Sequence, residues 1–280
     1  MFFRPERLGD ALDLLADHHA TILAGGTDLF PACPGGQLNG PVVDISGIAE
    51  LKGVRITADK VSIGGRTTWS EILTADLPRG FDGLRAAARE IGSVQIQNQA
   101  TVAGNICNAS PAADGVAALM ALDAEIVLTS RSGSRTLALS DFIQGNRKTA
   151  RQSQEILTAI QISRRWDHAA SSFLKLGARR YLVISIVMVA ANLIIRQDNR
   201  VARAAVCVGS CSPKALRLTE LESTLIGKDA DASLGDLIRS VHFSSLSPID
   251  DVRATAEYRR DAAQTMVRRA VAQCVSEGRR

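Results

Sequence analysis

The N-terminal third of the chain contains short apolar runs that each end at glycine or at another turn-forming residue. The runs TILAGG, PVVDIS, VRIT and KVSIGG begin at Thr21, Pro41, Val54 and Lys60. Runs of this length suit β-strands. Apolar residues recur at helical spacing before and after these runs, over residues 8–15 and 69–76. The sequence therefore predicts a mixed α+β fold, because strand-like and helix-like segments occur in the same region.

Further along, the pattern predicts a second domain. Helical patterns occupy residues 81–92 and 115–122, and strand patterns occupy residues 124–130 and 155–162. Residues 164–172 are then polar and short of apolar side chains, which is typical of a boundary. We place the boundary at Asp167, so that the predicted domains are 1–167 and 168–280.

The second domain contains the longest apolar run of the chain, YLVISIVMVAANLII, from Tyr181 to Ile195. This run is shorter than the about 20 residues that cross a bilayer as a helix, and its valines and isoleucines predict a buried strand. Strand-like segments also occupy 172–180 and 203–211, and helical patterns occupy 216–226 and the residues from 252 to the end. In the last helix, apolar residues recur three and four apart and predict one core-facing stripe. These residues are Ala263, Met266, Val267, Ala270, Val271 and Cys274.

The composition narrows the classes of function. The 280 residues carry a formal charge of +4 at a sequence pI near 8.9, and only 4% of them are aromatic. Nucleic-acid surfaces interleave aromatic rings with basic groups, so this composition argues against one. The five cysteines are scattered without a C-x-x-C pair, which argues against a disulfide framework or a cysteine-held metal cluster. The first residues, MFFRPERLGD, do not resemble a secretory signal, so we expect a cytoplasmic protein without membrane insertion.

The segment ILAGGTDLF, which starts at Ile22, places two glycines, a threonine and an aspartate directly after a short strand. Successive backbone N–H groups that point into one concavity bind phosphate well, and glycine permits that curvature without a blocking side chain. Gly25 and Gly26 meet this requirement, and the Thr27 hydroxyl is a further donor. The pattern is neither the G-x-G-x-x-G of a nicotinamide-binding fold nor a P-loop. It predicts a pyrophosphate site, although a tight turn alone also explains an isolated AGG.

A second glycine segment, TVAGNICNASPAADG, runs from Thr101 to Gly115. Its Thr101 hydroxyl, Gly104 backbone and Asn105 amide offer hydrogen-bond donors for a diphosphate. Asp114 carries a carboxylate, which is better suited to accepting from ribose hydroxyls than to approaching a phosphate. Two such segments, each expected at the end of a short strand, together predict a dinucleotide site.

The two glycine segments also belong to a longer pattern. Five segments, in order along the chain, resemble the FAD-binding medium subunit of the molybdenum hydroxylases, the family of xanthine dehydrogenase and carbon monoxide dehydrogenase. The segments are LAGGTDLFP, VVDISGIAELKGV, VSIGGRTTWSEI, QNQATVAGNICNASPAADGVAALMALDAEIVL and SPIDDVRATAEYRRDAA. The resemblance covers nearly the whole chain. It implies an α+β fold with an FAD-binding domain of the vanillyl-alcohol-oxidase (PCMH) type, in which the flavin lies between two α+β subdomains. A small C-terminal domain of an antiparallel sheet with helices would follow.

The resemblance carries the family's flavin contacts onto residues of this chain. The first glycine segment would surround the FAD diphosphate, and the second would also contact FAD. A strand residue and a lysine further along would lie near the isoalloxazine ring, and a shift of one residue would put Leu174 in the place of that lysine. The cofactor-binding residues implied are Ile22, Leu23, Ala24, Gly25, Gly26, Thr27, Asp28, Leu29, Thr101, Gly104, Asn105, Asn108, Asp114, Leu157 and Lys175.

Two residues depart from the family's pattern. The family usually reads Thr-x-Gly-Gly-Asn, and Ala103 stands here in place of the first glycine. An alanine fits that position if its φ is negative. An arginine is common in the family where this chain has Gln97. Neither departure removes a phosphate-binding donor from the segments, so we expect noncovalent FAD binding.

The resemblance implies a role in electron transfer. In the family, substrate is hydroxylated at a molybdenum cofactor on a large molybdopterin-binding subunit. Electrons then pass through two-iron two-sulfur clusters on a small subunit to FAD on the medium subunit. This chain would be the flavoprotein subunit of a heterotrimer or of a dimer of heterotrimers, without catalytic or metal-ligating residues of its own. We also hypothesise that Lys175 stabilises negative charge on the reduced ring, the alternative being a solvated lysine on a strand edge.

Two other functions stay open. One is a free-standing FAD-dependent oxidoreductase, which the lack of a recognisable acid–base set disfavours. The other is a noncatalytic scaffold subunit that has lost its flavin, which the intact Gly25-Gly26-Thr27 and Gly104-Asn105 disfavour.

Overall fold

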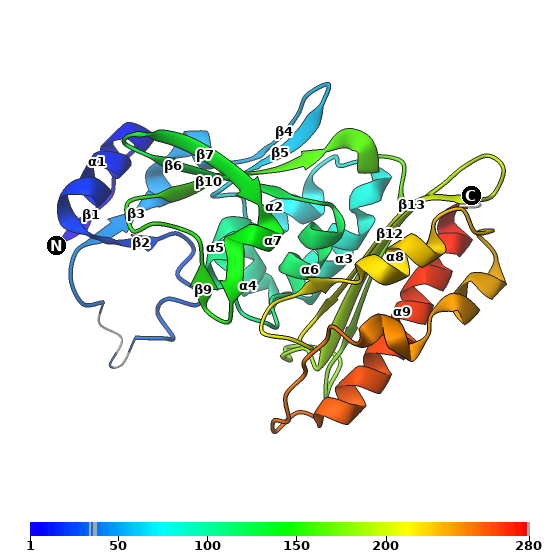
Figure 1. The fold of residues 1–280 in the computed structure, drawn as a ribbon. Helices are drawn as coiled ribbons and strands as arrows, with labels where there is room; N and C mark the ends of the chain where they lie inside the picture. Colours follow the sequence, from blue (N-terminus) through cyan, green and yellow to red (C-terminus); the bar gives the residue numbers. More distant parts are fainter. Residues whose placement is uncertain (34, 36–37, 279–280) are drawn as a thin grey trace. The chain divides into compact units, whose positions relative to one another are not determined.

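The computed structural model describes residues 1–33, 35 and 38–278, which form two compact units (Figure 1). Unit 1 comprises Met1–Ala75, Ser93–Ala109 and Ala124–Ile162. Unit 2 comprises Asp76–Gly92, Ser110–Asp123 and Ser163–Arg280. The chain therefore passes between the units five times. These units are defined by packing, and the boundary between sequence domains at Asp167 stays a prediction.

Unit 1 contains a parallel three-stranded sheet with the strand order β1-β3-β2. The strands are β1 (Phe2–Phe3), β2 (Thr21–Leu23) and β3 (Val42–Asp44). Helix α1 (Leu8–His18) connects β1 to β2, and its buried residues Ala11 and Leu15 join Val43 in one apolar cluster. The structure confirms the helix predicted over residues 8–15 and the two strands predicted after it.

The second sheet of unit 1 has five strands in the order β4-β5-β10-β6-β7. They are β4 (Val54–Ile56), β5 (Lys60–Gly64), β6 (Glu125–Ser130), β7 (Gly133–Ala138) and β10 (Ile156–Ser163), and a separate pair is formed by β8 (Ile143–Gly145) and β9 (Lys148–Thr149). The helices are α2 (Trp69–Thr74), α4 (Val94–Gln99), α5 (Val102–Asn108) and α7 (Leu139–Phe142). Thr68, Ser93 and Thr101 cap the starts of α2, α4 and α5, because each hydroxyl accepts a backbone N–H of the first turn.

Unit 2 is built on an antiparallel four-stranded sheet with the order β11-β12-β13-β14. The strands are β11 (Ala170–Leu176), β12 (Val187–Ile195), β13 (Val201–Gly209) and β14 (Leu216–Arg217). The helices are α3 (Asp82–Glu90), α6 (Asp114–Ala121), α8 (Thr219–Leu225) and α9 (Ala256–Gly278). The α+β fold and the antiparallel C-terminal sheet predicted from the sequence are confirmed. Short 3-10 helices occupy Ile45–Gly47 and Ala49–Leu51 in unit 1, and Arg79–Phe81, Arg164–Trp166, Ala232–Leu237 and Ser240–Phe243 in unit 2.

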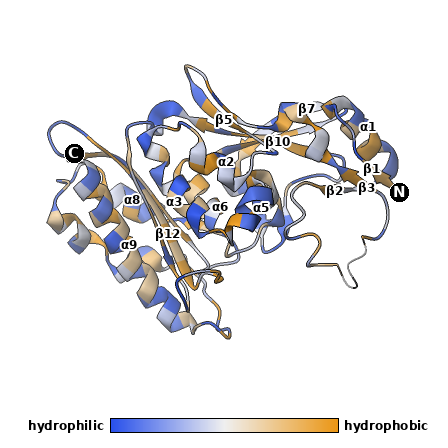
Figure 2. Ribbon diagram, turned by 180° about the vertical axis from the view of Figure 1, so that it is seen from behind, coloured by the Kyte–Doolittle hydropathy of each residue, from blue (hydrophilic) through white to orange (hydrophobic). Residues whose placement is uncertain are grey.

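Helices cover both faces of the unit 2 sheet, which explains why β12 is apolar except at Asn192 (Figure 2). Val189 and Ala191 join the apolar cluster that includes residues of α9. Asn192, the next residue, points to the other face, where its side chain donates to the Gly80 carbonyl at 3.1 Å. Successive strand residues point to opposite faces, so a strand covered on both sides loses the usual apolar and polar alternation.

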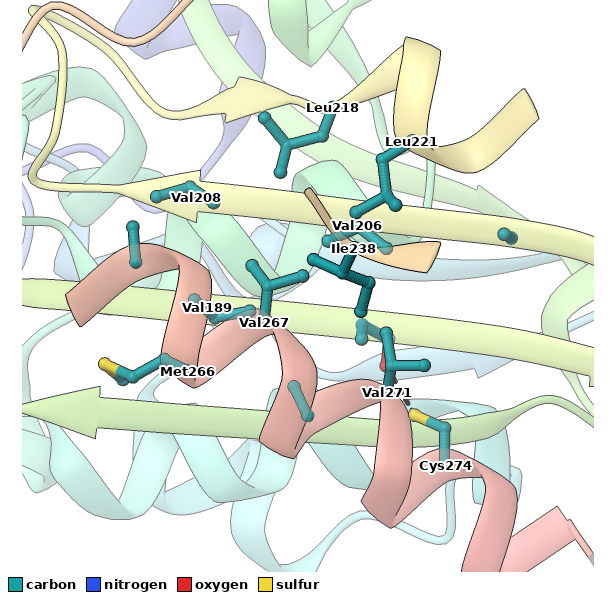
Figure 3. Close-up of a cluster of buried hydrophobic side chains, with 14 of the residues drawn as sticks. Val189, Val206, Val208, Leu218, Leu221, Ile238, Met266, Val267, Val271 and Cys274 are labelled. Carbon is teal, nitrogen blue, oxygen red and sulfur yellow. Dashed lines mark hydrogen bonds between the residues drawn. The ribbon is translucent and has the colours of Figure 1, made fainter. Parts of the chain in front are cut away.

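Helix α9 packs as its spacing predicts. All six residues of the predicted stripe are buried, with Met266 the most exposed at 6%. Figure 3 shows Val267 and Val271 of α9 beside Val189 and Val206 of the sheet. The Cys274 thiol donates to the Ala191 carbonyl at 3.3 Å, so this cysteine belongs to the core of unit 2. No helix among the described residues is long and apolar enough to cross a membrane.

The prediction of a strand over the whole run from Tyr181 to Ile195 is wrong. Strand β12 starts only at Val187, and Tyr181, Leu182 and Ile184 are 69%, 57% and 52% exposed. Leu182 has a φ of 52°, a left-handed conformation that strand residues do not adopt. The apolar run therefore begins in an exposed loop, because this backbone cannot continue the pleat.

The expectation that the second glycine segment ends a strand is also wrong. The residues before it form α4, and Thr101 makes only an isolated bridge with Thr68. The Thr101 hydroxyl accepts the Gly104 N–H at 3.0 Å, so the segment opens helix α5. Helices as short as α4 and α5 give too few turns for apolar periodicity to show in the sequence.

Candidate functional site

The first glycine segment leaves strand β2 and turns at once. Gly26 has a φ of 72°, in the left-handed region where glycine adopts the backbone without steric cost. The turn closes when the Phe30 N–H donates to the Gly26 carbonyl at 3.0 Å. The strand end, the turn and Thr27 all lie in unit 1.

Gly25 lies directly against the backbone that leads into the second glycine segment. A Cβ atom on Gly25 would lie 1.9 Å from the carbonyl oxygen of Gln99, at the end of α4 and just before Thr101. The backbone of the first segment therefore touches the backbone that leads into the second. The glycine is required here by a neighbouring chain segment, a reason that differs from the ligand approach inferred from the sequence.

The turn also presents backbone donors. Within the described part of the chain, the N–H groups of Gly25, Gly26, Thr27 and Asp28 donate no hydrogen bond. Consecutive N–H groups in a turn that contains a left-handed residue are a common anion-binding arrangement. The first segment can thus hold a phosphate group through its main chain.

In the second glycine segment, some hydrogen-bonding groups serve the fold and are not open to a ligand. The Gly104 N–H is taken up by the Thr101 cap, so it contributes to the helix start. Ala103 lies in α5 and is absent from the positive-φ residues of the described chain, which meets the condition for an alanine at this position.

The side-chain oxygen of Asn105 is buried and has no donor among the described residues. A buried acceptor of this kind normally has a partner, so Asn105 is a candidate for binding a ligand hydroxyl or amide.

Asn108, at the end of α5, is held by a residue that the sequence analysis missed. The Arg147 guanidinium donates to its side-chain oxygen. The Arg147 N–H also donates to the Ala109 carbonyl at 2.9 Å. Arg147 lies 39 residues further along the chain, and no local pattern marks it.

Leu157 lies on β10 in the same unit and is 3% exposed. A Cβ atom on Gly65 would lie 2.1 Å from the Leu157 carbonyl oxygen, so the segment after β5 passes directly against β10. Two residues later, the Thr67 carbonyl accepts the N–H of Val102, the first residue of α5, at 2.9 Å. Residues 65–67 thus connect Leu157 with the second glycine segment.

Asp114 and Lys175 belong to unit 2 and form an ion pair with each other. The Lys175 Nζ lies 2.6 Å from the Asp114 Oδ2, and both side chains are 7% exposed. The alternative of a solvated lysine on a strand edge is therefore wrong. Burial raises the pKa of the Asp114 carboxyl, while Lys175 and Ser185 act against this rise. Ser185, another residue that sequence analysis did not assign to the site, donates to the Asp114 Oδ1 at 2.6 Å.

The chemistry of these groups is that of a binding site. The N–H groups of the first segment suit a phosphate, and the Asn105 oxygen suits a hydroxyl or amide donor. Burial raises the pKa of the Cys107 thiol in α5 to about 11, so this thiol stays protonated near neutral pH and is a poor nucleophile.

Comparison with known protein families gives two matches that together span most of the chain. Residues 1–164 match the FAD binding domain in molybdopterin dehydrogenase. Residues 172–274 match the CO dehydrogenase flavoprotein C-terminal domain. These two matches agree with the FAD-binding domain and the small C-terminal domain that the resemblance implies.

Individual relatives agree with these families. The nicotinate dehydrogenase FAD-subunit of Eubacterium barkeri is 31% identical over 94% of this chain and 92% of its own length. The xanthine dehydrogenase FAD-binding subunit of Escherichia coli O157:H7 is 30% identical over 98% of this chain and 96% of its own. Among solved structures, a chain of reconstituted CO dehydrogenase from Oligotropha carboxidovorans superposes with a TM-score of 0.87 at 28% identity, over 98% of this chain and 97% of that chain. This chain therefore belongs to the FAD-binding medium subunits of the molybdenum hydroxylase family, and it is the flavoprotein subunit of an oxidoreductase.

Proposed function

We propose that this chain transfers electrons within a multi-subunit molybdenum hydroxylase. It would take electrons from the two-iron two-sulfur clusters of a small partner subunit and deliver them to an external acceptor. When bound, FAD supplies this redox chemistry, and the chain binds the cofactor and sets its surroundings. The observation that carries the proposal is the row of backbone N–H groups from Gly25 to Asp28, which donate no hydrogen bond within the described part of the chain and which follow the contact of Gly25 with Gln99, just before the second glycine segment.

The residues of unit 1 fit the phosphate and ribose parts of FAD. The N–H groups from Gly25 to Asp28 make no hydrogen bond within the described part of the chain, so they are open to a diphosphate. The Asn105 oxygen is buried without a donor, and a ribose hydroxyl would satisfy it. We propose that these two groups hold the cofactor directly. Thr101 and Gly104 shape the start of α5 through their mutual hydrogen bond.

We propose that Lys175 acts on the flavin electrostatically. Its ammonium group is buried, so its Coulomb interactions are stronger than those of a lysine in water. A nearby positive charge favours electron uptake by a ring that becomes negative, and the paired Asp114 offsets part of that charge. Lys175→Met is therefore expected to lower the reduction potential of bound FAD, measured by redox titration. An unchanged potential would contradict this role.

The proposed partners are a large molybdopterin-binding subunit and a small two-iron two-sulfur subunit, in a heterotrimer or a dimer of heterotrimers. Support comes from the relatives, whose names describe them as the FAD-subunit or FAD-binding subunit of a dehydrogenase. A cytoplasmic location, expected from the character of the first residues, belongs to the same proposal.

The first experiment is an absorption spectrum of the purified full-length chain, with the released chromophore identified after denaturation. We expect flavin bands and about one FAD per chain. Titration with FAD and with FMN should then show tighter binding of FAD, because FMN lacks the second phosphate and the adenosine. A chain that takes up neither flavin, alone or with the two partner subunits, would contradict the proposal and favour a scaffold subunit.

Copurification separates electron transfer within a complex from a free-standing oxidoreductase. The tagged chain is expected to bring down two partner chains that carry molybdenum and iron, in a fixed ratio to FAD. A flavin-loaded chain that purifies alone and oxidises a substrate without partners would contradict the proposed role.

A further inference from the structure

Phe30 contacts the turn that follows strand β2 in two ways. Its backbone N–H donates to the Gly26 carbonyl at 3.0 Å. Its ring lies against the same glycine, because a Cβ atom on Gly26 would lie 2.5 Å from the Phe30 Cε2 and 2.7 Å from its Cδ2. The Cδ1 of Leu23, at the end of β2, would lie 3.3 Å from that Cβ atom. Phe30 therefore holds Gly26 through both its main chain and its side chain.

The packing of this ring is local to the turn. Phe30 is 48% exposed, whereas Leu23 is 8% exposed. Phe30 is also not among the described residues that form or border the apolar cluster containing Val43 in unit 1. The ring thus packs on the turn and not on this core. Its removal is expected to leave the rest of unit 1 folded.

The turn needs such support for two reasons. Glycine has more backbone freedom than any other residue, so Gly25 and Gly26 lose the most conformational entropy when the turn is fixed. The N–H groups from Gly25 to Asp28 also donate no hydrogen bond within the described part of the chain. Main-chain hydrogen bonds follow only at the Phe30 N–H and at the Ala32 N–H, which donates to the Asp28 carbonyl at 3.3 Å. Packing of the ring on Gly26 adds order that these hydrogen bonds do not supply.

We infer that Phe30 is a positioning residue for the phosphates of the cofactor and that it acts through Gly26. Its ring fills the side of Gly26 on which other residues carry a Cβ atom. It thereby favours the left-handed conformation, with a φ of 72°, in which the neighbouring N–H groups have no main-chain partner. A diphosphate then meets a turn that is already ordered, which lowers the cost of binding. The inference rests on the proposed function, in which these N–H groups bind the FAD diphosphate.

The first test is the FAD affinity of full-length variants at position 30, measured by the change in flavin fluorescence on binding. Phe30→Ala is expected to weaken FAD binding by about tenfold, because the turn loses its preorganisation. Phe30→Tyr keeps the ring and should bind FAD within about twofold of the unsubstituted chain. Ile56→Ala is the matched control, since Ile56 is 45% exposed in β4 of the same unit, and it should leave the affinity unchanged. Thermal unfolding checks that each variant is folded.

The second test is a double-mutant cycle of Gly26→Ala and Phe30→Ala. In the unsubstituted background, the new Cβ atom has to displace the ring and is also attached to a left-handed backbone. With Phe30→Ala the clash with the ring is removed, and the strain of the backbone remains. Gly26→Ala should therefore weaken FAD binding by a factor at least about threefold smaller in the Phe30→Ala background. The same cycle, followed by urea unfolding without FAD, should show coupling of the same sign.

Three results would overturn the inference. The first is an FAD affinity of Phe30→Ala equal to that of the unsubstituted chain. The second is a loss of affinity in Phe30→Tyr as large as in Phe30→Ala, because the ring would then not be what positions the turn. The third is additivity of the two substitutions in the cycle, since contact between the ring and Gly26 predicts coupling. Failure of the unsubstituted chain to bind FAD would instead contradict the proposed function, and urea unfolding without FAD would still decide whether Phe30 holds Gly26.

Discussion

At the scale of single residues, the site depends on glycines for more than one reason. Gly26 adopts a φ of 72°, so glycine is favoured here by the left-handed conformation of its own backbone. Gly25 instead lacks a side chain because Gln99 occupies the space, with its carbonyl oxygen 1.9 Å from where a Cβ would lie. A sequence pattern shows two adjacent glycines and cannot distinguish these causes.

Gly25→Ala is accordingly expected to push the first glycine segment away from Gln99 and the backbone that leads into the second segment. Overpacking of this kind costs about 1–3 kcal/mol of unfolding free energy. We also expect FAD affinity to fall by at least about tenfold, which corresponds to about 1.4 kcal/mol of lost preorganisation. Calorimetric FAD titration and urea unfolding measure the two effects. Gly9→Ala, where a Cβ meets nothing within 4 Å, is the matched control, and equal behaviour of the two variants would contradict the argument.

At the scale of secondary-structure elements, an ion pair joins β7 to the residue before β10 in unit 1. Arg135 donates to the Glu155 carboxylate at 2.6 and 2.9 Å, and the Gln152 N–H donates to it at 2.6 Å. Burial alone would raise the pKa of the Glu155 carboxyl, but these donors outweigh it and hold the pKa below its ordinary value. A carboxyl with a lowered folded-state pKa stabilises the fold above its unfolded pKa of about 4.3. That contribution is lost as the pH falls through the folded-state pKa.

Arg135→Gln is therefore expected to lower the unfolding free energy at pH 7 by about 1–2 kcal/mol, a modest loss because Arg135 is 44% exposed and water screens the pair. The decline in stability below about pH 4.3 should also be shallower in this variant. Urea unfolding over a pH series measures both effects. Arg131→Gln, which removes an exposed pair with Asp13, serves as the control, and an identical pH profile for all three proteins would refute the account.

Helix α9 provides a test of packing in unit 2. Val267 is fully buried against the sheet (Figure 3). Val267→Ala removes two buried carbon atoms and leaves a cavity, so the unfolding free energy should fall by about 2–3 kcal/mol. Thr265→Ala, on the exposed side of the same helix, should change it by less than about 0.5 kcal/mol. Chemical denaturation distinguishes the two, and a cost below about 1 kcal/mol for Val267→Ala would argue against this packing.

At the scale of the whole molecule, each compact unit is formed from segments that are separate in the sequence. The strands of the unit 2 sheet all follow residue 167, but helices α3 and α6 come from earlier in the chain. The Gly83 N–H donates to the Ser171 hydroxyl at 3.0 Å, and Asp114 pairs with Lys175. A sheet buried on both faces needs both of its helical covers.

The fragment 168–280 is therefore expected to lack a cooperative unfolding transition when it is produced alone, because one face of its sheet would be exposed. Coexpression with the fragment 1–167 should restore the transition of the full-length chain, measured by circular dichroism on heating. A sharp transition of the fragment 168–280 by itself would show that α3 and α6 are dispensable for its folding.

Local patterns determined much of this protein. The α+β fold, helix α1, the core-facing stripe of α9 and the segments rich in ligand donors all follow from periodicity and turn residues within short windows of sequence. The family resemblance added the cofactor, because it depends on several such windows in a fixed order, and the family matches confirm it. Even the errors were local: the run from Tyr181 is apolar enough for a strand, but its backbone turns away at Leu182.

Only the tertiary structure decided which distant residues meet. Gly25 packs against Gln99, Arg147 holds Asn108, and Asp114 engages both Lys175 and Ser185. The hydrogen-bonded partners lie 39, 61 and 71 residues apart in the sequence. The physical reason is that a hydrogen bond or a close backbone contact is specified by position in space, and folding brings those positions together by burying apolar surface across the whole chain. A short window of sequence carries the donor or the glycine, and the fold supplies its partner.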